Sequence, residues 1–372
     1  MKAIVNGKII YKQKILSGYV LLFDKKIIAL DRNMPPEKYE IIDAKGDFVS
    51  AGFIDMHIHG SGGADVMDGT AEALETISRA LLQSGTTSFV ATTTTMSQND
   101  TLKAIENVVA HSSEVSGAKI RGLHLEGPFL NPAKSGAQDA RFIQKANFDW
   151  IIPYLDHIRV ITIAPEMPGA ESFIREIAVS HPQIILSIGH SEADYDTALE
   201  SFGWGISHVT HLFNAMSPWH HRVPGIVGAL FDSDITADII ADLIHIHPSV
   251  LQTVQAIKKE KLILITDAMR AGCMKSGIYD LGGQKVTVSE GRATLDNGVL
   301  AGSVLKLNEA VKNYYTLTGA TLPEALFSVT ELPAQRLGLS SGVLKEGFDA
   351  DIVIFDDEIQ IKSVYIDGKR KL

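Results

Sequence analysis

Residues 51–63 read Ala51-Gly52-Phe53-Ile54-Asp55-Met56-His57-Ile58-His59-Gly60-Ser61-Gly62-Gly63, an apolar run that ends in two histidines and then in glycines. Alternate residues of a strand face the same side, so His57 and His59 can hold one metal ion together. The glycines leave room for solvent and substrate beside such an ion. A half-buried strand whose imidazoles are satisfied by hydrogen bonds has the same pattern, so both interpretations stay open for this stretch taken alone.

Further apolar runs follow this one, and amphipathic segments lie between them. Leu74, Ile77 and Leu81, for example, fall on one face of a helix before Gly85. The eight predicted strands cover residues 53–59, 86–95, 119–126, 158–164, 184–190, 206–211, 235–246 and 262–267. Eight β-α units within residues 51–342 fit an α/β fold of the (β/α)8 TIM-barrel type better than an open sheet.

The two ends of the chain are predicted to form a second, smaller domain. Short β-type stretches separated by turn residues occur at residues 18–23, 26–30, 347–355 and 363–366. We therefore expect residues 1–50 and 343–372 to pair in a small β-sandwich beside the barrel.

Between the last barrel strand and the tail, residues 278–301 have hairpin character. Gly282-Gly283 and Asn297-Gly298 are the turn signals of this segment. Helices are predicted after it, at residues 304–317 and 323–337.

The composition is compatible with an ordinary enzyme that acts on small molecules. The chain has 372 residues, of which 45% are hydrophobic, and a formal net charge of −10 that disfavours binding to nucleic acid or to an anionic membrane. Cys273 is the only cysteine, so no internal disulfide can form. The N-terminus lacks the apolar stretch of a signal peptide and no run is long enough to span a bilayer, so we expect a cytoplasmic protein.

Polar residues recur where the predicted strands end. These ends carry His57 and His59, His124-Leu125-Glu126, Ile188-Gly189-His190, His208-Val209-Thr210-His211, His245-Ile246-His247 and Thr266-Asp267. The C-terminal strand ends are where TIM barrels place their chemistry. So many buried polar groups at one barrel mouth would be costly to desolvate, and a metal with bound water is the simplest arrangement that satisfies them.

Several motifs resemble those of the amidohydrolase superfamily, and within it the amino sugar phosphate deacetylases. They are His57-x-His59, His124-Leu125-Glu126-Gly127-Pro128-Phe129, Gly189-His190-Ser191, His211-Leu212-Phe213-Asn214-Ala215-Met216, His220-His221-Arg222-x-Pro224-Gly225 and Thr266-Asp267-Ala268. The resemblance implies hydrolysis of the N-acetyl group of N-acetylglucosamine 6-phosphate to glucosamine 6-phosphate and acetate, in amino sugar catabolism and cell-wall recycling.

The resemblance also implies the metal ligands. Glu126, His190 and His211 would hold the principal ion, and His57 and His59 a second one, with Glu126 bridging the two. This implies two divalent ions per subunit, zinc or iron, with manganese also acceptable to the ligand set. The alternative for Glu126 is a surface salt bridge or a helix N-terminal charge, although Gly127-Pro128 argues against a helix there.

Asp267 resembles the general acid and base of these enzymes. It follows the apolar run Leu262-Ile263-Leu264-Ile265, so it would be a buried carboxylate close to the water that the metal activates. It would take the proton of that water and deliver it to the leaving amine. The alternative is an N-cap aspartate of a following helix.

Substrate binding is implied by further matching residues. Arg222 offers a planar donor fork for the 6-phosphate, and His245 and the backbone amides at Asn214 and Ala215 would complete the cradle. Leu300, Ala301 and Gly302 resemble a substrate-lining loop. In relatives the arginine reaches in from a neighbouring subunit, which implies a homodimer, whereas His247 matches no family motif and is expected to be structural.

One position departs from the family pattern. In Ser135-Gly136-Ala137-Gln138, the glutamine stands where many deacetylases have a histidine that donates to the substrate carbonyl. Gln138 can donate through its amide but cannot become cationic. The alternative is a solvent-exposed loop residue.

Three classes of function are compatible with these residues. The first is the sugar phosphate deacetylase, with the galactosamine epimer as an alternative substrate. The second is another metal-dependent amidohydrolase, such as a deaminase, dipeptidase or cyclic-amide hydrolase, which would not need a phosphate-binding group. The third is a non-catalytic barrel, which would have lost ligands or the acid and base.

Overall fold

The barrel is the larger part of the computed structural model, which describes residues 1–33, 39–147 and 149–372. Eight strands of this part form one parallel sheet in chain order: β8 (Phe53–Ile58), β11 (Thr86–Thr93), β12 (Lys119–Glu126), β13 (Ile158–Ile163), β14 (Ile185–Ile188), β15 (His208–Val209), β16 (Thr236–Ile240) and β17 (Leu262–Ile265). The sheet closes because Ile58 pairs with Ala268, just after β17. The predicted (β/α)8 barrel is confirmed.

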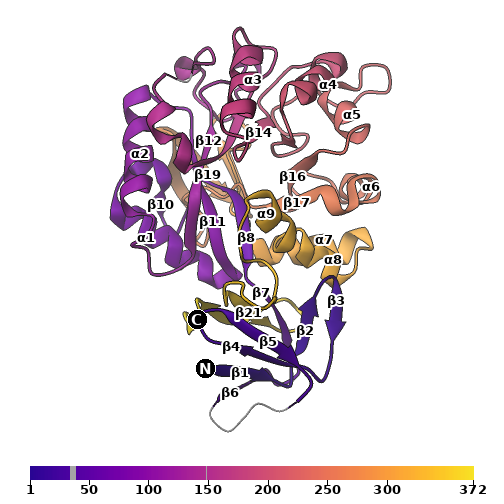
Figure 1. Cartoon of the computed structure of the whole chain (residues 1–372). Helices are drawn as coiled ribbons and strands as arrows, with labels where there is room; N and C mark the ends of the chain where they lie inside the picture. Colours follow the sequence, from indigo (N-terminus) through magenta and orange to yellow (C-terminus); the bar gives the residue numbers. More distant parts are fainter. Residues whose placement is uncertain (34–38, 148) are drawn as a thin grey trace.

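Helices surround the sheet, as Figure 1 shows: α1 (Ala71–Ala80), α2 (Gln98–His111), α3 (Ala170–Ser180), α4 (Tyr195–Trp204), α5 (Gly225–Phe231), α6 (Pro248–Lys258), α7 (Leu307–Thr318), α8 (Leu322–Phe327) and α9 (Glu331–Arg336). Every residue of β8 and β11 is buried, because one face packs inside the barrel and the other against the helices. The predicted helical face of α1 is confirmed, with Leu74 and Ile77 fully buried.

The seventh barrel strand is shorter than the sequence predicts. It ends at Ile240, whereas the apolar pattern predicted a strand to residue 246. The carboxylate of Asp242 accepts hydrogen bonds from the backbone N–H groups of Ile244 (2.9 Å) and His245 (2.8 Å), which turns the chain. His245 therefore lies in a loop, and His247 caps the N-terminus of α6 instead of ending a strand.

Strands from both chain ends form two further sheets below the barrel (Figure 1). One contains β5 (Ile27–Asp31), β4 (Val20–Phe23), β1 (Lys2–Val5) and β6 (Glu40–Asp43), and the other β23 (Lys369–Arg370), β22 (Ile361–Ile366), β21 (Ile352–Phe355), β7 (Phe48–Ala51), β2 (Lys8–Tyr11) and β3 (Lys14–Leu16). Side chains from both sheets, such as Leu21 and Ile352, share one core. This confirms the small β domain built from both termini.

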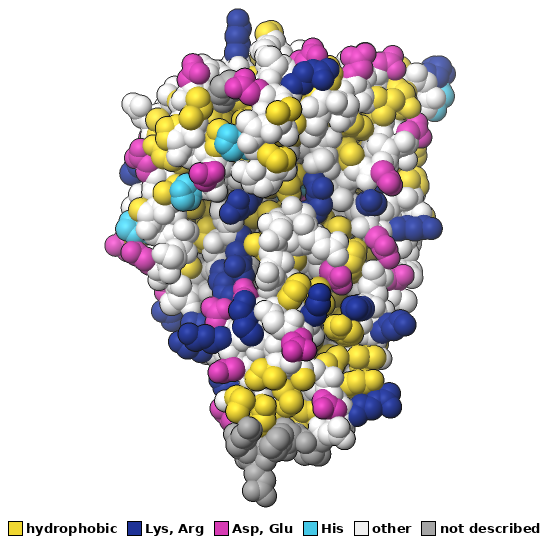
Figure 2. All heavy atoms as spheres, viewed as in Figure 1, with side chains coloured by type: hydrophobic (Ala, Val, Ile, Leu, Met, Phe, Trp, Pro, Cys, Tyr) yellow, Lys and Arg dark blue, Asp and Glu magenta, His cyan; other side chains and the backbone are white. Residues whose placement is uncertain are grey.

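Charged side chains of both signs are interspersed over the face in Figure 2, with Lys and Arg gathered where the barrel meets the small domain. At this junction Lys119 of β12 contacts Asp351 (3.0 Å) and Asp367 (2.6 Å), and Arg121 contacts Asp349 (3.3 Å). Lys119 and Arg121 of the barrel are thus paired with carboxylates of the small domain. Among the described residues, no helix has the length and apolarity needed to cross a bilayer.

A small antiparallel sheet follows β17 in the chain and precedes α7. It consists of β18 (Gly277–Leu281), β19 (Gln284–Ser289) and β20 (Arg292–Leu295), and Gly282-Gly283 form the first turn as predicted. Leu281, at the end of β18, is one of the residues over the barrel mouth.

Candidate functional site

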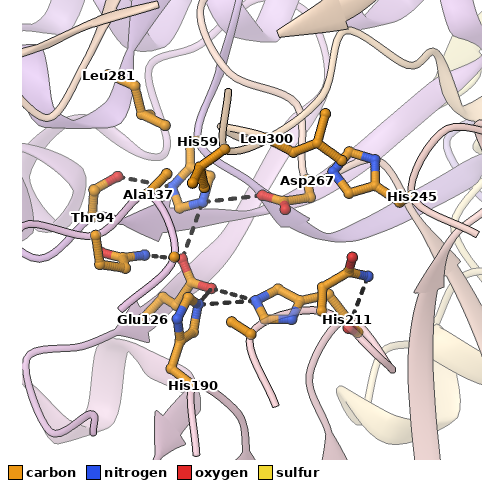
Figure 3. A pocket seen from close by; sticks show the side chains of 16 residues that line it. His59, Thr94, Glu126, Ala137, His190, His211, His245, Asp267, Leu281 and Leu300 are labelled. Atoms are coloured by element: carbon orange, nitrogen blue, oxygen red, sulfur yellow. Dashed lines mark hydrogen bonds and ion pairs between the residues drawn. The ribbon is translucent and has the colours of Figure 1, made fainter. Parts of the chain in front are cut away.

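A cavity of about 210 Å³ opens at the C-terminal ends of the barrel strands. Most residues predicted for the site line it: His59, Glu126, Ala137, Gln138, His190, His211, Asn214, Ala215, His245, Asp267, Leu300 and Gly302. Figure 3 shows the cavity, with His59, Glu126, His190, His211 and Asp267 among the labelled residues. His57 lies beneath them, fully buried. The barrel thus brings together side chains that are far apart in the sequence, because parallel strands end at one mouth.

Glu126, His190 and His211 form the first cluster. Glu126 ends β12, and its Oε1 lies 3.1 Å from His190 Nε2 and 3.0 Å from His211 Nε2. The two imidazole nitrogens are themselves only 3.1 Å apart. The three ligand atoms therefore converge on one point, a geometry that suits a metal ion.

The hydrogen bonds of His190 support this interpretation. Its Nδ1 lies 2.9 Å from the carbonyl oxygen of Lys134, which can only accept, so Nδ1 carries a proton. In the neutral ring, Nε2 then presents a lone pair to the oxygen of Glu126. Two acceptors that face each other repel unless a cation or a proton lies between them. This is the usual arrangement of a metal-binding histidine, whose second nitrogen donates to a backbone carbonyl.

His57 and His59 form the second cluster with the same carboxylate. His59 Nε2 lies 3.2 Å from Glu126 Oε2 and 3.2 Å from Asp267 Oδ1, and His57 Nε2 lies 3.5 Å from each of the two carboxylates. Neither ring nitrogen of the buried His57 has a hydrogen-bond partner among the described residues. A buried imidazole without partners is costly, and a second cation beside Glu126 would satisfy it.

The pKa values of these groups are set by their neighbours, which outweigh the effect of burial. Burial alone would raise the pKa of Glu126, but the imidazoles of His57, His190 and His211 hold it well below its usual range. Burial would likewise lower the pKa of His211, but Glu126 raises it to about 9. An ionised carboxylate with basic imidazoles is the donor set that a divalent cation prefers, since the cation replaces the protons.

Asp267 follows β17, and its carboxylate faces His59 Nε2, the same nitrogen that faces Glu126 (Figure 3). Burial would raise its pKa, but His57 and His59 hold that pKa below the usual value. Its backbone N–H donates to the carbonyl of His57 (2.9 Å), and its own carbonyl accepts from Ser303 (2.8 Å). No described helix begins directly after Asp267, so the N-cap alternative is wrong.

The loop of Leu300 and Gly302 lies directly beside Asp267. A side chain at Gly302 would place a Cβ 2.9 Å from the carbonyl oxygen of Asp267, so glycine is needed for this close approach. The predicted neighbour Ala301 does not line the cavity. It is fully buried among Met269 and Val286 under the β18–β20 sheet.

His245 reaches the cavity from the loop after β16. Its Nδ1 lies 2.7 Å from the carboxylate of Asp242, which leaves Nε2 free for a ligand. The predicted backbone amide of Asn214 is not available, because it donates to the carbonyl of His211 (2.9 Å). The side-chain NH2 of Asn214 donates to that carbonyl (3.1 Å) and to the carbonyl of Leu212 (3.2 Å), so the Asn214 side chain offers its oxygen rather than its nitrogen.

Arg222 lies outside the cavity of its own chain. It belongs to an exposed loop, and its Nη1 lies 2.8 Å from His221 Nε2.

Gln138, in contrast, is buried, so the exposed-loop alternative for it is wrong. Glu126 is also buried, which excludes the surface salt bridge.

Other histidines at strand ends serve the structure. His124 contacts the Thr162 hydroxyl (2.7 Å), and His208 contacts Thr236 (2.7 Å) and Asp238 (3.1 Å). Sequence reasoning did not identify Thr94, whose Oγ1 lies 3.1 Å from His59 Nδ1. The run of threonines at the end of β11 is the feature of the sequence that could have indicated this contact.

Comparisons with known proteins agree with this geometry. The model of the amidohydrolase family matches residues 48–371. The chain is 38% identical over 361 residues to N-acetylglucosamine-6-phosphate deacetylase of Bacillus subtilis (strain 168), covering 93% of this chain and 91% of that protein. It is 33% identical over 342 residues to N-acetylgalactosamine-6-phosphate deacetylase of Escherichia coli O157:H7, covering 90% of each. A crystal structure of N-acetylglucosamine-6-phosphate deacetylase from Pasteurella multocida matches with a TM-score of 0.94 and 31% identity over 99% of both chains.

Proposed function

The chain belongs to the amidohydrolase family, and from this premise we propose that it hydrolyses the N-acetyl group of N-acetylglucosamine 6-phosphate to glucosamine 6-phosphate and acetate. The observation that carries the proposal is the pair of ligand clusters around Glu126, with Asp267 beside them, at the bottom of a cavity. The likeness to N-acetylglucosamine-6-phosphate deacetylases over nearly the whole chain supports the substrate.

Glu126, His190 and His211 would hold one divalent ion, and His57, His59 and Glu126 a second. Two imidazoles and a carboxylate suit zinc or iron, and manganese is also acceptable to them. A divalent cation at this place lowers the pKa of a bound water and polarises a carbonyl oxygen.

Asp267 acts as the general base and then as the general acid. Its carboxylate is ionised at neutral pH because His57 and His59 hold its pKa low, so it can accept the proton of the attacking water. The same proton then goes to the amide nitrogen as the C–N bond breaks, because an amine must be protonated to leave. Oδ1 of Asp267 lies 3.2 Å from His59 Nε2, so the proposed proton acceptor is next to the ligand clusters.

The phosphate group is bound by His245 together with Arg222 of a neighbouring subunit in a homodimer. The carboxylate of Asp242 orients His245 so that Nε2 points to the cavity. Arg222 is exposed and outside its own cavity, which is the placement required of a residue that completes another subunit's site. The cytoplasmic location predicted from the sequence is part of the same proposal.

The galactosamine epimer is the second candidate substrate, because a relative of 33% identity has that name. The experiment is acetate release from N-acetylglucosamine 6-phosphate, its galactosamine epimer and unphosphorylated N-acetylglucosamine, with metal content measured on the same sample. We expect N-acetylglucosamine 6-phosphate to have the highest kcat/KM of the three. Equal values with and without the phosphate would contradict the phosphate-binding role, and no release from any of them would contradict the proposed activity.

A further inference from the structure

Gln138 is buried in the loop after β12, and protein groups contact both ends of its side-chain amide. The backbone N–H of Thr95 donates to Gln138 Oε1 at 2.6 Å. Gln138 Nε2 donates to Glu126 Oε2 at 2.7 Å. Because a backbone N–H can only donate, the contact with Thr95 fixes which end of the amide is the oxygen, and the NH2 group must face Glu126.

This hydrogen bond acts on the oxygen of Glu126 that the first cluster does not use. Oε1 faces His190 and His211, and Oε2 faces His59 at 3.2 Å. Oε1 also lies 3.5 Å from His57 Nε2, so the rotation of the carboxylate decides which imidazoles each oxygen faces. A donor at Oε2 fixes the rotation of the carboxylate plane and keeps Oε1 directed at the two imidazoles.

The same loop also holds His190. The carbonyl of Lys134 accepts from His190 Nδ1 at 2.9 Å, so residues 134–138 contact two ligands from outside. The loop is anchored in turn by Gln284 of β19, whose Nε2 donates to the carbonyl of Ala137 at 2.5 Å. One short segment therefore connects the small β18–β20 sheet to both clusters.

We propose that Gln138 is a positioning residue that orients the carboxylate of Glu126 for metal binding, and that residues 134–138, anchored by Gln284, maintain the affinity of the site for metal. Gln138 contributes by donating to Glu126, and this contribution does not require contact with substrate. The inference rests on the metal site proposed above.

The test compares Gln138→Leu with the wild type and with Gln144→Leu, a matched change in the same loop whose side chain is outside the site. Zinc affinity is measured by competition with a chromophoric chelator, and metal per chain by elemental analysis. We expect Gln138→Leu to bind zinc roughly 10- to 100-fold more weakly, the usual effect of removing a group that orients a ligand. We expect Gln284→Leu to weaken zinc binding in the same direction, and Gln144→Leu to leave it unchanged.

If Gln138→Leu binds zinc as tightly as the wild type and only kcat falls, Gln138 acts on the substrate and the proposal is wrong. Should Gln138→Leu not fold, Gln138→Met provides a flexible side chain of similar length without a donor, and the same affinities decide. Wild-type protein that binds no metal would instead refute the metal site itself, so the two failures can be told apart.

Discussion

Replacing Asp267 by asparagine removes the proposed proton acceptor with little change in shape. Asp267 has a left-handed backbone with φ of 48°, which asparagine tolerates better than most residues. Its backbone bonds to His57 (2.9 Å) and Ser303 (2.8 Å) do not depend on the side chain. The amide oxygen can still accept from His59, but the amide cannot carry the proton from water to the leaving amine.

General acid and base catalysis by a positioned side chain contributes about 100- to 10,000-fold. We therefore expect kcat/KM of Asp267→Asn to fall by about that factor, which corresponds to about 3–5 kcal/mol of activation free energy. The metal content and the midpoint of thermal unfolding should stay close to those of the wild type. Acetate release, elemental analysis and calorimetry on the same preparation measure the three quantities.

The matched control is Asp296→Asn, a change of the same kind at an exposed ion pair with Lys285 in the hairpin region. It should leave all three quantities unchanged. If Asp267→Asn retains its metal and turns over within tenfold of the wild type, another group carries the proton. If it loses metal, Asp267 is a ligand, and the assignment to proton transfer alone is wrong.

Three further changes test other parts of the structure. His59→Leu should lower the metal content from two ions to about one per chain, by elemental analysis, because the cluster of Glu126, His190 and His211 remains; two retained ions would contradict a site at His59. Arg222→Ala should raise KM for the phosphorylated sugar about 10- to 100-fold, because a charge-assisted hydrogen bond is lost, and should leave KM for the unphosphorylated sugar unchanged. An unchanged KM for the phosphorylated sugar would show that Arg222 does not bind the phosphate. Burial lowers the pKa of Lys258 to about 8, against about 10.4 in the unfolded chain. Between these two pH values the unfolded state binds more protons, so the wild type should gain stability with rising pH relative to Lys258→Met. Denaturant titrations at pH 7 and 9.5 that give the same stability difference between the two proteins would contradict this.

The barrel was predictable because its strands are buried on both faces and read as continuous apolar runs. The same feature explains the error at β16. Residues 239–246 remain rich in isoleucine and leucine, and the turn at Asp242 depends on side-chain hydrogen bonds to the backbone of Ile244 and His245. A hydrophobic pattern carries no information about such a turn.

The site was predictable where residue type and strand end coincide, as at Glu126 and His190. For loop residues the sequence did not decide between an inward and an outward side chain, because the direction of a loop depends on distant partners. Gln138 points inward since Thr95 and Glu126 bind its amide, and Ala301 points into the core under the β18–β20 sheet. Neither outcome follows from the local sequence, in which each residue lies within two positions of a glycine.

The backbone conformation of the site residues at the strand ends cannot be predicted from their residue types. His190, His211 and Asp267 have positive φ values of 48°, 29° and 48°, and each lies two residues beyond the end of β14, β15 or β17. For residues other than glycine, a left-handed conformation costs roughly 1–2 kcal/mol and persists only where neighbours fix it.

The neighbours that fix these three residues are hydrogen-bond partners of the backbone. The N–H of Asn131 donates to the carbonyl of His190 (3.0 Å), the N–H of His211 donates to the Asp238 carboxylate, and the N–H of Asp267 donates to the carbonyl of His57 (2.9 Å). Each bond joins a strand end to a different strand or loop around the mouth. The strained conformations are therefore maintained by the closed barrel as a whole, which turns three side chains that would otherwise continue along their strands toward one point. This explains why His190 and His211, far apart in the sequence, both lie about 3 Å from Glu126 Oε1.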